Sequence, residues 1–469
     1  MQTIIQHTET FLTRIYEKVN TGITDVDELS SDILEDCKEL ARNIVQEAII
    51  QMNENLREDK RTRKELGLTL KEKDRPRVLL TRLGELKFNR DCYYNKKTNH
   101  YETPLDKMIS VERYTRVGDA VSAELVTMAT EVSYAKSSSI VTGGKVSRQT
   151  VKNQIQRTPM LEKQADETIR EAKILDVYAD EDHVHMQKQN KERGKKNKIV
   201  PLVTVTEGIE KVCKNRNRTI NTMHFVDENF DSSSLWESVE GYIEKTYNTE
   251  NIDTIRIHAD GGKWIRNGLE SFANVEHVMD GYHLQKRLKQ LDRVFKGRNV
   301  RKRINEAIRE NNFSKVEQII SELYKDCNSS NDAKLLQEML TYLGSNWEAI
   351  VNRYEEDMTG SCTEGQVSHV LSERFSRNPM GWSEAGLGKL AKLRVYTKNG
   401  GKITSKQFKK NYEVNESYRQ YAEKYLAKSE NKYDFSWIED MRELYIPDTT
   451  SGTQQAIRNL GRMQDHFLN

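Results

Sequence analysis

Residues 174–283 alternate between strand-like and helix-like segments in an order that restricts the possible fold. Three segments rich in β-branched and apolar residues, at 174–187, 199–205 and 219–226, follow one another with short links and are typical of strands. A helical segment to about residue 247 precedes a strand, a helix, a second strand and another helix. Short links favour antiparallel strands, whereas strands separated by helices run parallel. We therefore expect a mixed α/β fold whose later strands are parallel.

Acidic residues accompany two of these strands. Asp180 lies in the first strand, and Asp260 directly follows the later strand 255–259. Polar groups at the carboxyl ends of parallel strands point into the crevice where α/β proteins place their sites. If the strands are neighbours, the carboxylates converge, and magnesium or manganese would relieve their repulsion. Asp176 and Asp182 share the alternation of Asp180 and are alternatives to it.

A third acid follows a long helical stretch. Residues 284–358 show helical periodicity without a strand signal, which predicts an all-helical insertion between the second and third acids. Ser361 and Glu364 then fit a helix capping box, and the same helix start could direct Glu364 at the metals. Glu373 is the competing acid. Two ions at such a site can activate a hydroxyl and stabilise the leaving oxygen in phosphodiester chemistry.

The near-neutral chain carries strong local charge. Its 74 Lys and Arg balance 72 Asp and Glu, yet basic residues gather at 188–198, 281–303 and 388–412. Such blocks suggest local contacts with a polyanion, and a solvated helix face is the alternative for any one of them. In the second block, the candidate contacts are Lys286, Arg287, Arg301, Lys302 and Arg303.

The region before the sheet has three patterns. Residues 24–56 show helical spacing, 57–76 are charged and resemble a linker, and 78–94 alternate as a β-hairpin does. Residues 115–158 return to helical spacing, with a Gly turn before a helix capped by Ser147. This pattern predicts a helix-turn-helix, with an ordinary αα-hairpin as the alternative. Its exposed candidates for DNA contact are Arg148, Gln149 and Lys152.

Composition excludes other classes of protein. The five cysteines are scattered singly, which excludes a zinc ribbon built on paired cysteines and argues against a disulfide framework. No apolar stretch approaches the roughly 18–20 residues of a membrane span. The first residues show neither the basic leader nor the apolar core of a secretory signal. We expect a soluble, cytoplasmic protein.

The order of the acidic motifs resembles that of the DDE transposases, which have an RNase H-like core. Asp280-x-x-His283 is similar to a short motif between the second and third acids of Mutator-like relatives. The resemblance is closer to the ISLre-type insertion-sequence transposases and covers about residues 75–400. It is carried by the sequences at 83–85, 179–184, 258–261 and 362–372.

This resemblance implies a transposase that binds the inverted-repeat ends of an insertion sequence, cuts there and joins the exposed 3′-hydroxyl to target DNA. It implies Asp180, Asp260 and Glu364 as the catalytic, metal-binding triad, with Asp280 and His283 in support. Magnesium, replaceable by manganese, would bind as two ions. The partners would be double-stranded DNA and further copies of the chain on that DNA, with no membrane.

Four more residues have candidate roles in DNA contact. Arg374 and Arg377 follow Glu364 on the same helix and could contact phosphate. Trp264 and Trp382 could stack on unpaired bases at a cleaved end, although core packing is the stronger alternative for each.

We divide the chain into six predicted regions. They are a helical region and linker at 1–75, a hairpin region at 76–112, a helix-turn-helix region at 113–160, the first part of the core at 161–283, the helical insertion at 284–358, and the completion of the core with a basic C-terminal region at 359–469. Two other functions stay open. One is a structure-specific nuclease on the same core, and the other is a non-catalytic DNA-binding protein derived from an inactivated element.

Overall fold

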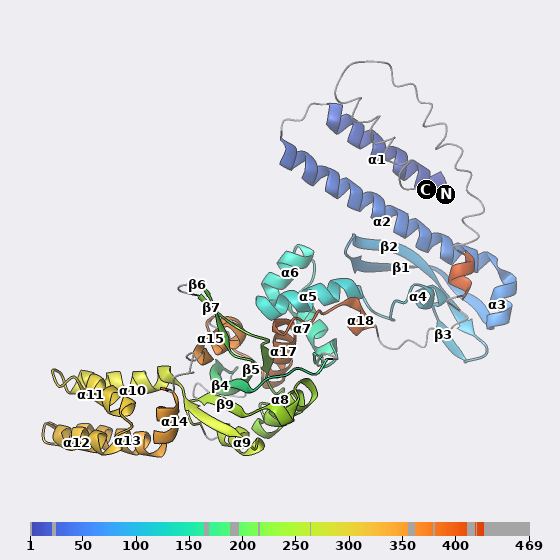
Figure 1. Ribbon diagram of the computed structural model, residues 1–469. Helices are drawn as coiled ribbons and strands as arrows, with labels where there is room; N and C mark the ends of the chain where they lie inside the picture. Colours follow the sequence, from blue (N-terminus) through green and yellow to red (C-terminus); the bar gives the residue numbers. More distant parts are fainter. Residues whose placement is uncertain are drawn as a thin grey trace. The chain divides into compact units, whose positions relative to one another are not determined.

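The computed structural model describes most of the chain as two units, whose elements are drawn in Figure 1. One unit comprises Met1–Gly118 and Lys410–Asn469, and the other comprises Asp119–Lys409. The predicted region 359–469 is therefore divided between them. The described residues are 2–20, 25–163, 168–187, 197–213, 216–262, 264–354, 362–378, 380–409, 418 and 420–425.

The N-terminal unit packs a long helix on an antiparallel sheet of order β1-β2-β3. Its elements are α1 (Gln2–Asn20), α2 (Val26–Glu58), α3 (Lys60–Leu66), β1 (Leu68–Thr81), β2 (Gly84–Asn95), β3 (His100–Glu102) and α4 (Pro104–Met108). The carboxylate of Asp25 accepts hydrogen bonds from the first backbone N–H groups of α2 and so fixes its start. Ile49 and Met52 of α2 pack against Leu79 and Phe88 of the sheet. The predicted helix at 24–56 and hairpin at 78–94 are both confirmed.

The predicted linker at 57–76 is wrong. This stretch forms the end of α2, then α3 and the first half of β1. Residues 71–76 of β1 are exposed on both sides of the strand, so charged residues occupy both faces. A strand without a buried face lacks the period-2 alternation by which strands are identified.

The second unit begins with three packed helices, α5 (Asp119–Glu131), α6 (Tyr134–Thr142) and α7 (Arg148–Arg157). Gly143 ends α6 in the left-handed conformation, with φ of 61°, and the hydroxyl of Ser147 caps α7. The hydroxyl of Ser137 donates to the carbonyl oxygen of Leu125 at 2.8 Å and so joins α6 to α5. The helical pattern predicted at 115–158, including its Gly turn, is confirmed.

A five-stranded mixed sheet of order β10-β9-β4-β5-β8 forms the centre of this unit. Strand β5 is antiparallel to β4 and β8, whereas β9 is parallel to β4 and β10. The expected mixed sheet is confirmed. A hairpin, β6 and β7, precedes β8 and was not predicted; its strands are short and largely exposed. The strands are β4 (Ile174–His185), β5 (Asn197–Thr206), β6 (Ile209–Cys213), β7 (Arg216–Thr219), β8 (Met223–Phe225), β9 (Thr254–Ala259) and β10 (Val275–Met279).

The two faces of β4 have different coverings. Leu175, Val177 and Ala179 belong to one apolar core with residues of α8 (Ser232–Thr246) and with Ile265, which begins α9 (Ile265–Ser271). A 3₁₀ turn, Thr249–Asn251, precedes β9. The alternate residues of β4, which include Asp180, lie on the opposite face. The helix α15 (Thr363–Val367) contacts β4 and leads into a π-helical turn, Ser368–Ser372, and α16 (Glu373–Phe375). The helices α17 (Glu384–Lys398) and α18 (Ser405–Phe408) pack against α5.

Five helices follow β10 and form a lobe with its own core, drawn in yellow to orange in Figure 1. The all-helical insertion predicted at 284–358 is confirmed as far as the structure describes it, to residue 354. Leu284, Leu288 and Leu291 of the first helix are fully buried in this core. The helices are α10 (Gly281–Val294), α11 (Val300–Arg309), α12 (Phe313–Tyr324), α13 (Ser330–Ser345) and α14 (Trp347–Asn352).

Candidate active site

The sheet register brings Asp180 and Asp260 to neighbouring positions. Tyr178 of β4 pairs with His258 of β9, and these parallel strands continue in the same direction. Asp180 and Asp260 each lie two residues further along, where the paired part of the two strands ends. One Asp260 carboxylate oxygen accepts a hydrogen bond from the backbone N–H of Gly262 at 2.9 Å, which orients the side chain.

His283 reaches the same end of the sheet from the start of α10. The buried carboxylate of Asp280 caps this helix and accepts hydrogen bonds from the N–H groups of Tyr282 and His283 at 3.1 and 3.2 Å. A Cβ at Gly281 would lie 2.2 Å from the Arg353 guanidinium, so a side chain there would displace the end of Arg353. The Asp280-x-x-His283 motif therefore fixes the direction in which α10 leaves the sheet.

Glu364 completes the cluster from α15. One ligand atom each of Asp180, His283 and Glu364 lies within 4.8 Å of the other two. These residues come from a strand, the start of the insertion and the segment after it. The two carboxylates are donors that suit magnesium and manganese, and the imidazole is a donor that suits transition metals such as zinc and iron.

Burial and charge act together on Asp180, whose residue is 9% exposed. Burial raises the pKa of Asp180 to about 7, and the nearby charges of Asp260 and Glu364 act in the same direction. The N–H of Glu181 and the imidazole of His283 oppose this rise. Among the described residues, the grouped ligand atoms do not include Asp260, although its charge acts on Asp180. A bound cation would offset the repulsion among these carboxylates.

Asp176 and Asp182 share the face of Asp180 but have other surroundings. An Asp176 carboxylate oxygen lies 2.8 Å from Nε2 of the buried His258. Asp182 is 8% exposed, and burial raises its pKa, which Ser376 and Ser372 partly oppose. Among the described residues, the grouped ligand atoms include those of Asp180 and of neither alternative.

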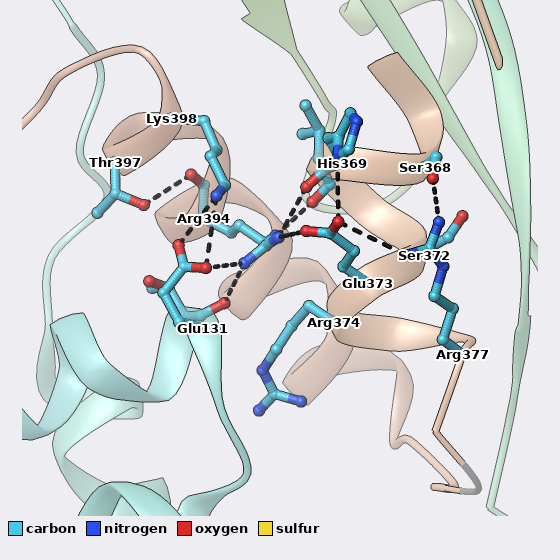
Figure 2. A network of polar contacts seen from close by, with 12 residues as sticks. Glu131, Ser368, His369, Ser372, Glu373, Arg374, Arg377, Arg394, Thr397 and Lys398 are labelled. Atoms are coloured by element: carbon cyan, nitrogen blue, oxygen red, sulfur yellow. Dashed lines mark hydrogen bonds and ion pairs between the residues drawn. The ribbon is translucent and has the colours of Figure 1, made fainter. Parts of the chain in front are cut away.

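Glu373 lies in a different network, drawn in Figure 2. Its carboxylate is 2.9 Å from Nδ1 of His369 and forms ion pairs with Arg377 at 3.5 Å and Arg394 at 3.7 Å. The hydrogen bond from His369 lowers the pKa of Glu373. The described ligand-atom group includes Glu364 and not Glu373.

The predicted capping box at Glu364 is wrong. The helix α15 begins after Cys362, which makes no side-chain cap, and Ser361 lies outside the described residues. With Cys362 as N-cap, Glu364 is one position too early for a capping box.

The predicted phosphate contact at Arg374 is wrong. Arg374 is 2% exposed, and its Nε donates to the carbonyl oxygen of Ala129 at 2.9 Å. Its guanidinium lies 4.8 Å from the ring centre of Trp382. Because Arg374 is buried and bonded within the protein, its guanidinium is not accessible to a phosphate. Arg377 is 55% exposed and reaches Glu373 and Ser368.

The tryptophans predicted as stacking candidates pack within the protein. Trp382 is 6% exposed, and its indole N–H donates to the carbonyl oxygen of Phe375 at 3.1 Å. Base stacking at Trp382 is therefore contradicted. Trp264 stacks on Trp236 with ring centres 6.2 Å apart, and its N–H donates to Glu181.

Tyr282 is an exposed aromatic residue beside the cluster that was not predicted. Tyr282 is 52% exposed, and its ring centre lies 5.5 Å from that of His283. Nζ of Lys286 lies 5.7 Å from the ring centre of Tyr282. The sequence did contain a signal for it, because Tyr282 lies off the apolar stripe that begins at Leu284.

The basic blocks differ in how free their charges are. Arg148, Gln149 and Lys152 are exposed on α7, as are Lys286 and Arg287 on α10 and Arg301 and Lys302 on α11. The half-buried Arg303 pairs with Glu322, and Arg301 lies 3.8 Å from Asp292. In the third block, Lys389 is buried and Lys392 and Lys398 pair with Glu162 and Glu131. Most of the block at 188–198 lies outside the described residues.

The fold and site define a mixed α/β protein with acidic residues gathered at one end of neighbouring strands. The model of an uncharacterised protein family, UPF0236, matches residues 19–412, and the chain belongs to this family. One relative, a UPF0236 protein of Caldanaerobacter subterraneus subsp. tengcongensis whose name joins eleven locus designations, is 31% identical over 437 residues, 92% of this chain and 90% of its own length. UPF0236 protein TTE2489 of the same organism is 31% identical over 420 residues, 88% of this chain and 87% of its own. Within the described part of the chain, no helix has the length and apolar character needed to cross a bilayer.

Proposed function

We propose that this protein is a DDE-type transposase, which cleaves DNA at the ends of an insertion sequence and joins those ends to a target. The observation that carries the proposal is the convergence of acids from distant parts of the sequence. Ligand atoms of Asp180, His283 and Glu364 lie within 4.8 Å of one another, and the charges of Asp260 and Glu364 both act on Asp180, although about a hundred residues separate Asp260 from Glu364. The strand order supports an RNase H-like core, because the first strand, with Asp180, lies directly beside the fourth, which ends at Asp260.

The carboxylates of the site suit magnesium or manganese, and the proposed chemistry uses two such ions. Asp180 and Glu364 offer oxygen ligands, Asp260 adds charge, and the imidazole of His283 adds a nitrogen donor. Such ions, when bound, activate a water or 3′-hydroxyl and stabilise the leaving oxygen. The carboxylates would hold the ions. Asp280 caps the start of α10 and so directs His283 towards the carboxylates.

Exposed groups elsewhere in the same unit support DNA binding. In a helix-turn-helix, the second helix enters the major groove, and Arg148, Gln149 and Lys152 are exposed on α7. Lys286, Arg287 and the basic face of α11 would contact the phosphate backbone. Tyr282, with Lys286 beside it, replaces the tryptophans as the ring that stacks on an unpaired base.

The names of the relatives support a mobile element. One UPF0236 protein carries eleven locus designations from a single organism, and another carries four. A gene that copies or moves itself is expected at many loci of one genome.

Incubation of the protein with DNA carrying its flanking genomic ends tests the proposal. With magnesium or manganese, we expect cleavage at the ends and joined products. Asp260→Asn should abolish both and retain DNA binding, because it removes one acid of the proposed triad and leaves the DNA-binding surface. Asp253→Asn, at the other end of β9, is the matched control. Cleavage without joining would indicate a nuclease, and binding without cleavage would indicate a non-catalytic DNA-binding protein.

A further inference from the structure

The helix that follows Glu364 contains a π-helical turn at Ser368–Ser372. Such turns are rare and are frequently found at functional sites. Their wider hydrogen-bond spacing departs from the regular pairing of the helix carbonyls. Two carbonyl oxygens of this turn accept hydrogen bonds from Arg394 of α17. Nη2 of Arg394 donates to the carbonyl of His369 at 2.8 Å, and Nε donates to that of Val370. A side chain thus supplies donors to this irregular turn.

The same guanidinium binds the end of α5. Nη1 of Arg394 donates to the carbonyl oxygen of Thr130 at 2.7 Å and to the carboxylate of Glu131 at 2.9 Å. Arg374 donates to the preceding carbonyl, that of Ala129. The last carbonyls of a helix lack partners within it and favour cations. Two arginines from beyond Glu364 therefore cap α5.

Figure 2 shows Arg394 between Glu131 and Glu373, with Arg374 on the same stretch of helix as Glu373. We call these four residues the Arg394 cluster. Its arginines are 1% and 2% exposed. Burying a charge costs free energy unless hydrogen bonds and an opposite charge compensate it. Well-packed apolar residues in place of a buried ion pair often give a fold of equal or greater stability. What the planar guanidinium adds is a fixed geometry, because its donors point in set directions.

The Arg394 cluster lies on a continuous path from α7 to Glu364. Helix α7 packs on α5 and α6, and the hydroxyl of Ser137 fastens α6 to α5. The cluster joins the end of α5 to the π-helical turn, which continues α15 and its Glu364. Every element of this path belongs to one unit.

We propose that the Arg394 cluster sets the distance between the bases read by α7 and the phosphate cut at Glu364. The inference rests on the proposed transposase function. Arg394 lies outside the metal cluster, so it is a positioning residue. Successive nucleotides lie about 3.4 Å apart along a strand, so a shift of that size between α5 and the π-helical turn moves the cut by one nucleotide.

The test maps the cut positions on end-labelled DNA at single-nucleotide resolution with the full-length protein. Glu131→Gln and Glu373→Gln each remove one carboxylate from the cluster, and their side chains are 46% and 39% exposed, so these variants should fold. Arg394→Lys keeps the charge and loses the planar fork. For all three, we expect cuts at neighbouring positions to rise at least twofold as a fraction of the product. DNA affinity and manganese affinity should stay within about twofold of wild type.

The matched control is Glu322→Gln, which removes the ion pair with Arg303 in the insertion and should leave the cut position unchanged. Variants that cut more slowly but only at the wild-type position would reduce the cluster to a packing role and overturn the inference alone. A wild-type protein that cuts no DNA would overturn the proposed function and this inference together.

Discussion

Asp180 is a buried carboxylate among like charges, which suits metal binding but opposes folding in the absence of a metal. It lies in the sheet with 9% of its surface exposed, and two other carboxylates act on it. The arrangement suits a metal ligand and disfavours the metal-free fold, because a charged carboxylate there is largely buried and lies near two like charges. Its stability cost should therefore be measurable without any assay of activity.

Replacement of Asp180 by Asn should stabilise the metal-free protein, and more so at pH 8 than at pH 5. The pKa of Asp180 is raised from 3.8 to about 7, so the folded state binds its proton more tightly than the unfolded state. The folded protein then loses stability as the pH rises from about 4 to 7. The variant lacks this loss and should gain on the order of 2–4 kcal/mol at pH 8. Unfolding in EDTA at both pH values measures this gain, and an equal gain at both would contradict the prediction.

Tyr282 should contribute to binding of a DNA end with an unpaired base. Stacking of one base on an aromatic ring is worth about 1–3 kcal/mol, so Tyr282→Ala should weaken binding of an overhang by that amount, while Tyr282→Phe keeps the ring. Blunt duplex binding should change little. Tyr324→Ala, which removes another exposed ring of the same lobe, is the control. Equal effects on overhang and blunt ends would argue against stacking.

The choice among the three acids of β4 could not be made from their spacing, and the prediction of Asp180 came from the family resemblance. Asp176, Asp180 and Asp182 alternate on the same face, so periodicity treats them alike. What separates them is the register with β9, which pairs Asp176 with Arg256 and Tyr178 with His258 and so brings Asp180 level with Asp260. Register depends on contacts between strands some eighty residues apart, which no local pattern contains.

At the scale of elements, α7 offers the clearest test of sequence recognition. Replacing both Arg148 and Gln149 by Ala should reduce discrimination between element ends and random DNA by about 1–3 kcal/mol for each side chain that reads a base. Affinity for random DNA should fall less, because backbone contacts elsewhere remain. Competition binding measures the ratio, with Lys136→Ala on α6 as control. An unchanged ratio would assign these three helices to packing.

Elements with one buried face were predictable and elements without one were not. The helices and strands around the apolar core could be recognised because their hydrophobic spacing matches their geometry. The exposed half of β1 and the hairpin of β6 and β7 have no such spacing. The π-helical turn was also missed, since Arg394, which binds its carbonyls, lies more than twenty residues later. The burial of Arg374 was missed for the same reason, because its hydrogen-bond partner, Ala129, is distant in sequence.

At the scale of the whole molecule, the insertion should add general affinity for DNA. Replacing Arg301, Lys302 and Arg303 by Gln should weaken binding to all DNA sequences similarly and flatten its salt dependence by about one unit of log–log slope for each phosphate that is no longer neutralised. The control replaces Lys315 of α12, Lys325 directly after α12 and Lys334 of α13 by Gln, which removes the same charge from another part of the lobe. Equal reductions in affinity in both variants would mean that net charge, and not this surface, controls affinity.

The helical insertion leaves and rejoins the sheet at one place. Helix α10, the first of the lobe, begins directly after β10. At the end of α14, the last helix of the lobe, the side-chain amide of Asn352 donates to the carbonyl oxygen of His277 in β10 at 3.0 Å. The Arg353 guanidinium meanwhile fills the space beside Gly281. Because the start of α10 and the end of α14 both lie against β10, the helices between them can be added, removed or exchanged with little effect on the sheet. The lobe is therefore a part of the chain whose length and helices can change while the sheet is retained.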